Sequence, residues 1–233
     1  LAASLSADCP LLAWNTARPA PPHPERCLAL IPAPVRNRSG MAQLVELVVQ
    51  AGTLPEVATA ATELILALHL TPLRAGGRAM LPSMLHTARQ TATRLVELGV
   101  PAGVLHKSGL LPAGALMPIG ARPPDTTPPD TPSPPLPLPA DRLLLLALIN
   151  AGARLLESAQ ALRPSDIDIA MVLGAGFPNW RGGPMAEADT MGTLVLRQEL
   201  LQAAPLDPAL WAPAPLIDEL IRQGWRFDDL NSG

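Results

Sequence analysis

The stretch from residue 141 to residue 192 constrains the fold of this chain more than any other. It opens with residues 143–149, which are all leucine, isoleucine or alanine. A helix that is apolar on every side has to lie inside a core, so this run predicts a buried central helix. The rest of the chain must then supply helices that cover it.

A second helix is predicted to follow, from about residue 165 to residue 173. Ser165 can cap it through its hydroxyl, and Asp166 and Asp168 suit the positive end of a helix dipole. Gly174 is placed to end it. A last amphipathic helix is predicted for residues 215–223, which place apolar side chains at helical spacing.

The loop at residues 174–185 is the most distinctive sequence segment of the chain. Its glycines allow backbone angles that other residues resist, while Pro178 and Pro184 fix theirs. We interpret it as a rigid turn between helices, with Phe177 and Trp180 filling the core. The alternative is a loop beside a ligand channel or a subunit contact.

Composition restricts the class of protein. The net charge of −3 provides no basic surface for nucleic acid. Cys9 and Cys27 lack metal-ligand spacing and are interpreted as buried free thiols of a reducing compartment. No run approaches the ~20 apolar residues that cross a bilayer, and no signal segment opens the chain. We therefore expect a cytoplasmic protein, and the start at Leu1 rather than Met suggests a fragment.

Two strand-length apolar runs, residues 9–14 and 27–31, precede the helices. They cannot form a stable sheet alone and need partner strands. Two further helices are then predicted. The first starts at a capping box, Thr53 to Glu56, and ends at His69.

The second of these helices covers residues 80–98. His69 is interpreted as a cap of the first helix and His86 as structural. No acid or cysteine lies at metal-ligand spacing from His86, so no metal site is predicted. The proline-rich residues 121–140 predict an extended spacer, the alternative being a PxxP ligand for a recognition domain.

Several motifs carry a resemblance to a known family. ALINAGARLLE, ALRPSDIDIAMVLGAGFP, RGGPM and ADTMG, within residues 141–192, resemble the second C-terminal helical domain of the long 3-hydroxyacyl-CoA dehydrogenases. These are multifunctional enzymes of fatty-acid β-oxidation that also carry an enoyl-CoA hydratase domain. WNTARP, PERCLALIPAPV and QLVELV are similar to the last strands of the family's NAD-binding domain.

The resemblance implies a mainly α fold, in which two small helical domains of the 6-phosphogluconate-dehydrogenase-C-like type follow a remnant of a Rossmann α/β domain. The expected divisions are residues 1–50 for the remnant, 51–120 for the first helical domain, 121–140 for the linker and 141–233 for the second helical domain. In this family the helical domains close over the acyl thioester and also form the dimer interface, so the resemblance implies these roles for the helical domains here.

The site residues come from the same resemblance. Glu46, in LVELV, matches the glutamate that orients the catalytic histidine, with a plain polar strand position as the alternative. Asn15, in WNTARP, is the candidate cofactor-binding residue. The glycine-rich fingerprint G-x-G-x-x-G is absent, so NAD, the cofactor of the intact family, is not expected to bind this chain alone.

Other catalytic positions of the family are lost. The histidine position falls on Leu28, the serine on Ala17 or Arg18, and the substrate-contacting asparagine on Pro82. An orienting carboxylate without its imidazole transfers no proton. The chain alone is therefore expected to be inactive.

Two functions remain open at this point. The chain is either the C-terminal part of a 3-hydroxyacyl-CoA dehydrogenase or an inactive paralogue that serves as a dimerisation or scaffold module. Expected partners are an acyl-CoA substrate and either a second copy or the missing N-terminal portion. An unrelated helical interaction protein is a third possibility, which the matches over residues 141–192 argue against.

Overall fold

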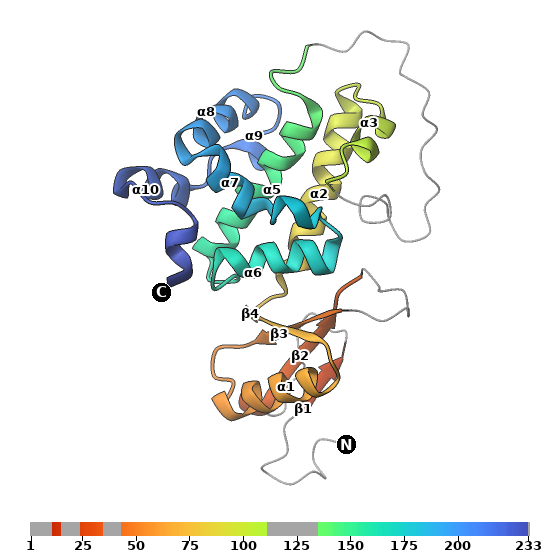
Figure 1. Cartoon of the computed structure of the whole chain (residues 1–233), viewed down its shortest axis with the longest axis vertical. Helices are drawn as coiled ribbons and strands as arrows, with labels where there is room; N and C mark the ends of the chain where they lie inside the picture. The colour runs from red at the N-terminus through yellow and green to blue at the C-terminus, as the bar shows by residue number, and fades with distance from the viewer. Residues whose placement is uncertain (1–10, 15–23, 35–42, 111–134, 233) are drawn as a thin grey trace.

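The fold is that of a computed structural model, which describes residues 11–14, 24–34, 43–110 and 135–232. The described residues form a small sheet at one end of the molecule and a body of helices at the other (Figure 1). The polypeptide passes from the sheet into the helices through the start of α2 (Met80–Glu97). The predicted order, a strand-rich start followed by helices, is confirmed.

The sheet of the described residues has four strands in the order β1-β2-β3-β4. They are β1 (Leu11–Trp14), β2 (Cys27–Pro32), β3 (Leu44–Val49) and β4 (Thr71–Gly76). The pairs β1–β2 and β3–β4 are parallel, whereas β2–β3 is antiparallel. A short 3-10 turn, η2 (Pro24–Arg26), leads into β2. The two predicted runs therefore do find partner strands.

Strand β4 corrects the expectation that residues 51–120 are helical throughout. It follows α1 (Pro55–Ala67), which crosses from β3 to β4 and covers one face of the sheet. Proline is tolerated in β4 because this strand lies at the edge of the described sheet, where the missing N–H of Pro72 costs little. The domain division itself stays a prediction.

The face of the sheet under α1 is apolar. Its side chains form one buried cluster: Leu28, Leu30, Val45, Leu47, Val57, Ala58, Ala61 and Ile65. His69 follows α1 in the left-handed conformation, with φ of 58°, and its N–H bonds the Leu66 carbonyl. This geometry fits the predicted role of His69 at the helix end.

The helical body is built around α5 (Ala140–Glu157), whose residues 143–150 are all buried. Trp211 donates its indole N–H to the Leu143 carbonyl over 2.9 Å. The buried Asn150 amide bonds the carbonyls of Leu210 and Ala212 and the N–H of Ala214. The prediction of a buried central helix is confirmed.

The other helices pack around α5 or against α2. They are α3 (Ala102–Lys107), α6 (Pro164–Ile169), η3 (Ala170–Gly174), η4 (Asn179–Arg181), α7 (Pro184–Met191), α8 (Thr193–Ala203), α9 (Pro208–Trp211), α10 (Pro215–Gln223) and η5 (Asp228–Ser232). One continuous core runs from β4 and α2 through α5 to Phe227. The helices before and after the proline-rich segment therefore share their apolar interior.

Two predicted helix caps are wrong. Thr53 does not cap α1, because its hydroxyl accepts from the Gln50 N–H and donates to the Cys27 carbonyl. Ser165 lies inside α6, one residue after its start, and its N–H bonds Asn231. In both places proline starts the helix with a fixed φ and no side-chain cap.

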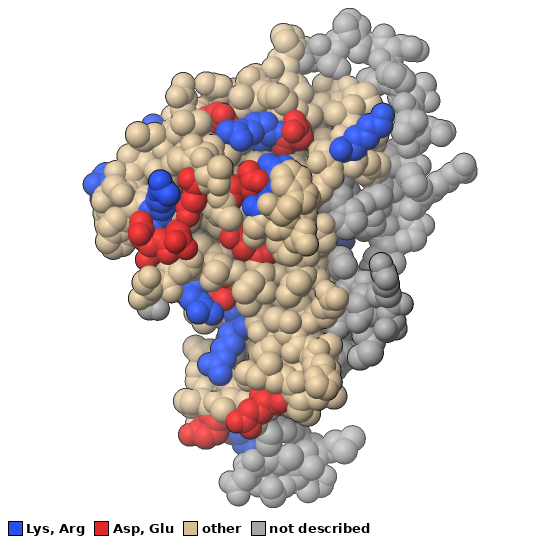
Figure 2. Space-filling view, in the orientation of Figure 1, with Lys and Arg blue, Asp and Glu red and all other residues tan. Residues whose placement is uncertain are grey.

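The described surface carries no extended field of one charge on the face shown in Figure 2, where acidic and basic side chains are interspersed over the helical body. Among the helices of the described residues, none combines the length and apolarity needed to cross a membrane. Within the same residues, no three His, Cys, Asp or Glu side chains gather where they could hold a metal ion. Cys27 is buried and free, and Cys9 lies outside the described residues.

Candidate functional site

Glu46 lies in the middle of β3 and points away from α1, towards the start of α2. Its side chain is buried, with 1% of the residue exposed. The Oε1 atom accepts the backbone N–H groups of Met80, at 3.0 Å, and Leu81, at 2.8 Å. Since the first N–H groups of a helix have no partner within the helix, Glu46 stabilises the start of α2.

The second carboxyl oxygen of Glu46 is unsatisfied. Oε2 is buried and has no hydrogen-bond partner among the described residues. Burial raises the pKa of Glu46 from 4.5 to about 7, although the two N–H bonds act to lower it. A half-satisfied carboxyl of this kind is unusual, because buried polar atoms are nearly always paired.

The strand register shows which residues face Glu46. Ile31 is directly opposite Glu46 across the β2–β3 pair, so their side chains lie on the same face of the sheet. Leu28 is three residues earlier on β2, which turns its side chain to the opposite face. It is fully buried in the apolar cluster under α1. The structure therefore does not bring Leu28 and Glu46 together.

A cleft of about 780 Å³ opens on the Glu46 side of the sheet, between the sheet, α2 and the end of α5. Ile31 and Pro82 line it, together with Arg78 and the polar side chains of Ser158 and Gln160. Among the described lining residues there is no His, Asp, Glu or Cys that could accept a proton. The described wall of the cleft therefore carries no general base of these types.

The predicted site residues are thus distributed as follows. Pro82 lines the cleft, Glu46 lies buried beside it, and Leu28 is on the far face of the sheet. Asn15, with Ala17 and Arg18, lies outside the described residues. The cofactor-binding role of Asn15 and the orienting role of Glu46 stay predictions.

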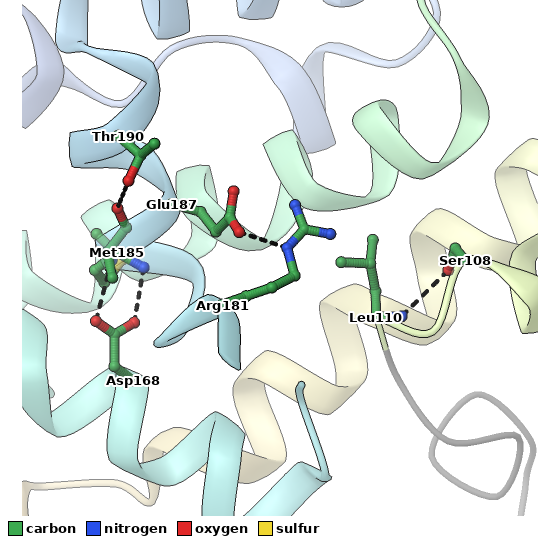
Figure 3. Close-up of polar contacts among 8 residues, drawn as sticks. Ser108, Leu110, Asp168, Arg181, Met185, Glu187 and Thr190 are labelled. Carbon is green, nitrogen blue, oxygen red and sulfur yellow. Dashed lines mark hydrogen bonds and ion pairs between the residues drawn. The ribbon is translucent and has the colours of Figure 1, made fainter. Parts of the chain in front are cut away.

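A second buried carboxylate, Asp168 on α6, organises the glycine–proline loop. Its Oδ1 accepts the Met185 N–H at 2.7 Å and its Oδ2 the Ala186 N–H at 3.1 Å, at the start of α7 (Figure 3). Burial raises the pKa of Asp168 to about 7 against the effect of these two bonds. A Cβ on Gly183 would lie 2.3 Å from Oδ1, so glycine is required for this approach.

This contact explains the loop as a rigid turn. Arg181 forms an ion pair with Glu187 of α7, also drawn in Figure 3. Phe177 is 2% exposed and fills the core as predicted, but the prediction for Trp180 is wrong, since it is 81% exposed. The Arg181 guanidinium lies over the Trp180 ring instead, 5.7 Å from its centroid.

Sequence reasoning assigned Asp168 to the dipole of its own helix and missed its bond to α7. The available signal was the pair Gly183-Pro184, because proline is favoured at the first helical position and glycine has no side chain that could cap the helix. The sequence does not show which distant side chain supplies that cap.

Comparisons with known proteins agree with this geometry, although no family model matches the chain. The fatty acid oxidation complex subunit alpha of Idiomarina loihiensis is 32% identical over 83 residues, or 36% of this chain and 12% of that protein. The peroxisomal bifunctional enzyme of Danio rerio is 39% identical over 82 residues, or 34% of this chain and 11% of that protein. The matches thus cover about a third of this chain and about a tenth of each relative.

The fold has a solved counterpart. The crystal structure of 3-hydroxybutyryl-CoA dehydrogenase from Escherichia coli K12 superposes with a TM-score of 0.66 at 15% identity, covering 92% of this chain and 76% of that one. At that identity the likeness shows the fold, a mainly helical region after a Rossmann remnant. The sequence relatives and this fold together support a partial 3-hydroxyacyl-CoA dehydrogenase family region in this chain.

Proposed function

We propose that this chain is the C-terminal part of a 3-hydroxyacyl-CoA dehydrogenase of fatty-acid β-oxidation that retains an acyl-CoA-binding cleft but does not itself oxidise the substrate. The intact family oxidises 3-hydroxyacyl-CoA to 3-oxoacyl-CoA with NAD. The observation that carries the inactive state is the buried Glu46 carboxyl, whose Oε2 bonds no imidazole or other donor among the described residues.

The loss of the proton acceptor supports the inactive state. Oxidation of a hydroxyl requires a group that takes its proton, and such a group contributes roughly 10²–10⁴ in rate. Leu28 is apolar and faces away from the cleft, while Ile31 and Pro82 supply no ionisable atom. Glu46 is committed to the start of α2 through Oε1.

The described residues also do not fit NAD. A dinucleotide pyrophosphate needs a glycine-rich turn that leads from a strand into a helix start. The described turn from β3 to α1 contains Gly52 alone, and the turn from β4 to α2 contains Gly77 between Gly76 and Arg78. Neither has the G-x-G-x-x-G spacing, so these described turns supply no pyrophosphate-binding site for NAD.

A dimerisation or scaffold module in the cytoplasm is the second candidate function. Its support is the helical body, which keeps a continuous core while exposing large apolar side chains such as Trp180 at 81% and Leu194 at 68%. Exposed apolar side chains of this size are often covered by a partner. Size-exclusion chromatography with light scattering tests it, and a monomer at all concentrations would exclude a homodimer.

The main proposal is tested by binding and turnover together. We expect acetoacetyl-CoA to bind in isothermal titration calorimetry and NADH not to bind. Arg78→Gln is expected to weaken acetoacetyl-CoA, because Arg78 is the cation that the described residues contribute to the cleft. Arg222→Gln, on the exposed surface of α10, is the matched control and should leave binding unchanged.

The outcomes separate the two parts of the proposal. Acetoacetyl-CoA-dependent oxidation of NADH by this chain would contradict the inactive state. An absence of acetoacetyl-CoA binding would contradict the retained cleft and leave the scaffold function as the better account.

A further inference from the structure

A second groove, of about 560 Å³, lies between α2, α5 and α9. It shares only Ser83 with the cleft beside Glu46. One wall is a polar stripe of α2, in which His86, Arg89 and Gln90 recur at helical spacing. Ala147, on α5, begins an apolar wall on the other side. The two walls differ in polarity along the length of the groove.

The lining of the groove includes three arginines and two carboxylates, Glu97 and Asp207, and two of the arginines are committed to the fold. Arg94 pairs with Glu97 at 3.1 Å and donates to the Leu206 carbonyl at 2.9 Å. Arg154 donates to the carbonyls of Ala209, at 2.6 Å, and Ala212, at 3.0 Å. These contacts attach α9 and its flanking residues to α2 and α5, so neither guanidinium is free for a ligand.

Arg89 differs from these two arginines. Its Nε is buried and has no hydrogen-bond partner in the part of the chain that the structure describes. Leaving a buried charged donor without an acceptor is costly, so such a group usually has a partner. Because Arg89 lines the groove, an acceptor that occupied the groove would meet its guanidinium, and a bond to the buried Nε itself requires the side chain to shift.

The opposite wall indicates the rest of the ligand. It presents apolar atoms from α5 and α9, contributed by Ala147, Ala151, Leu155 and Leu210. A groove of about 560 Å³ lies within the range of roughly 300–1,000 Å³ that suits small organic ligands. The planar guanidinium fork is well suited to carboxylate or phosphate oxygens.

We propose that this groove binds a small organic oxyanion, a phosphate or carboxylate joined to a compact apolar body. The anionic group bonds Arg89, and the apolar body packs against α5. This inference is independent of the proposal that the cleft beside Glu46 binds acyl-CoA, because the groove and that cleft share no charged residue.

The test titrates phenyl phosphate and, separately, benzoate into the full chain at constant ionic strength by isothermal titration calorimetry. At least one of them is expected to bind with one site, and the pair distinguishes a phosphate head from a carboxylate head. Arg89→Gln is expected to weaken that binding about tenfold or more, the effect of losing a hydrogen bond to a charged group. Arg89→Lys keeps the charge but loses the forked geometry of the guanidinium. Its affinity should lie between those of the unmodified chain and of Arg89→Gln.

Two controls locate the site. Arg222→Gln removes a positive charge away from the groove and should change nothing, while Arg78→Gln alters the other cleft and should also leave this binding intact. The proposal is overturned if neither ligand binds, if Arg89→Gln binds as tightly as the unmodified chain, or if Arg78→Gln abolishes binding instead. Circular dichroism checks that each variant folds, and if Arg89→Gln does not, the affinity of Arg89→Lys decides.

Discussion

Replacement of Glu46 by glutamine should change how the stability of the chain depends on pH. Burial raises the pKa of Glu46 to about 7 in the folded chain, against 4.5 for an ordinary glutamate. The folded state therefore holds this proton more tightly than the unfolded state. Stability is highest below the unfolded pKa and falls as the pH rises through the folded pKa.

The magnitude follows from the size of the shift. A pKa displaced from 4.5 to about 7 corresponds to about 3–4 kcal/mol, at about 1.4 kcal/mol per unit. Between about pH 5 and about pH 8, about 2–3 kcal/mol of that stability should be lost from the unmodified chain. Asp168 has a similarly raised pKa, but it is present in both proteins and its contribution cancels.

Glu46→Gln keeps an oxygen for the N–H groups of Met80 and Leu81 and places an amide group where Oε2 has no partner. That unpaired amide costs about 1–3 kcal/mol at every pH. The informative quantity is therefore the difference in the free energy of unfolding between the two proteins, and how that difference changes with pH. This difference should move in favour of the variant by about 2–3 kcal/mol from about pH 5 to about pH 8.

Urea unfolding followed by circular dichroism measures both proteins at the two pH values. Glu63→Gln, on the exposed side of α1, serves as the control for the loss of a negative charge. If the stability difference between Glu46→Gln and the unmodified chain is the same at both pH values, the buried carboxyl is not protonated on folding and the reasoning is refuted.

Three further changes have expected outcomes. Leu28→His should restore no dehydrogenase turnover in an NADH assay. It should also destabilise the chain by about 2–4 kcal/mol in urea unfolding, because the imidazole enters an apolar cluster. Measurable turnover would show that the side chain reaches the cleft. Gly183→Ala should lower the melting temperature through the clash with Asp168 and the φ of 130°, at a cost of about 1–3 kcal/mol or more; an unchanged melting temperature would contradict the close approach. Phe177→Ala should cost about 3–5 kcal/mol, whereas Trp180→Ala should stay within about 0.5 kcal/mol; equal losses would mean that both rings are buried.

The sequence was informative wherever local pattern and burial agree. Residues 143–149 are apolar on every side, and only a core position satisfies such a helix, so α5 could be predicted without knowledge of its neighbours. The last helix was predicted at residues 215–223, the bounds that α10 has, because its spacing and flanking Pro215 and Gly224 are local signals.

The sequence was less informative where a residue's role depends on distant atoms. Pro72 disfavours a strand locally, yet β4 forms because β3 offers it an edge. The sequence predicts Trp180 as a core residue. Its side chain is exposed instead, on the turn whose end Asp168 holds at the start of α7. The caps at Thr53 and Ser165 were predicted from neighbouring residues, whereas proline starts both helices.

By itself, the sequence determined that this protein has a mainly helical body after a few strands and that its motifs resemble the dehydrogenase family. It also predicted Glu46 of LVELV as the candidate orienting carboxylate. Only the tertiary structure decided what that carboxylate does, because its partners, Met80 and Leu81, lie more than thirty positions away along the chain. The same holds for Leu28, which counting along the strand matches to the catalytic histidine. Side chains alternate across a sheet, so the register of β2 against β3 turns Leu28 away from Glu46.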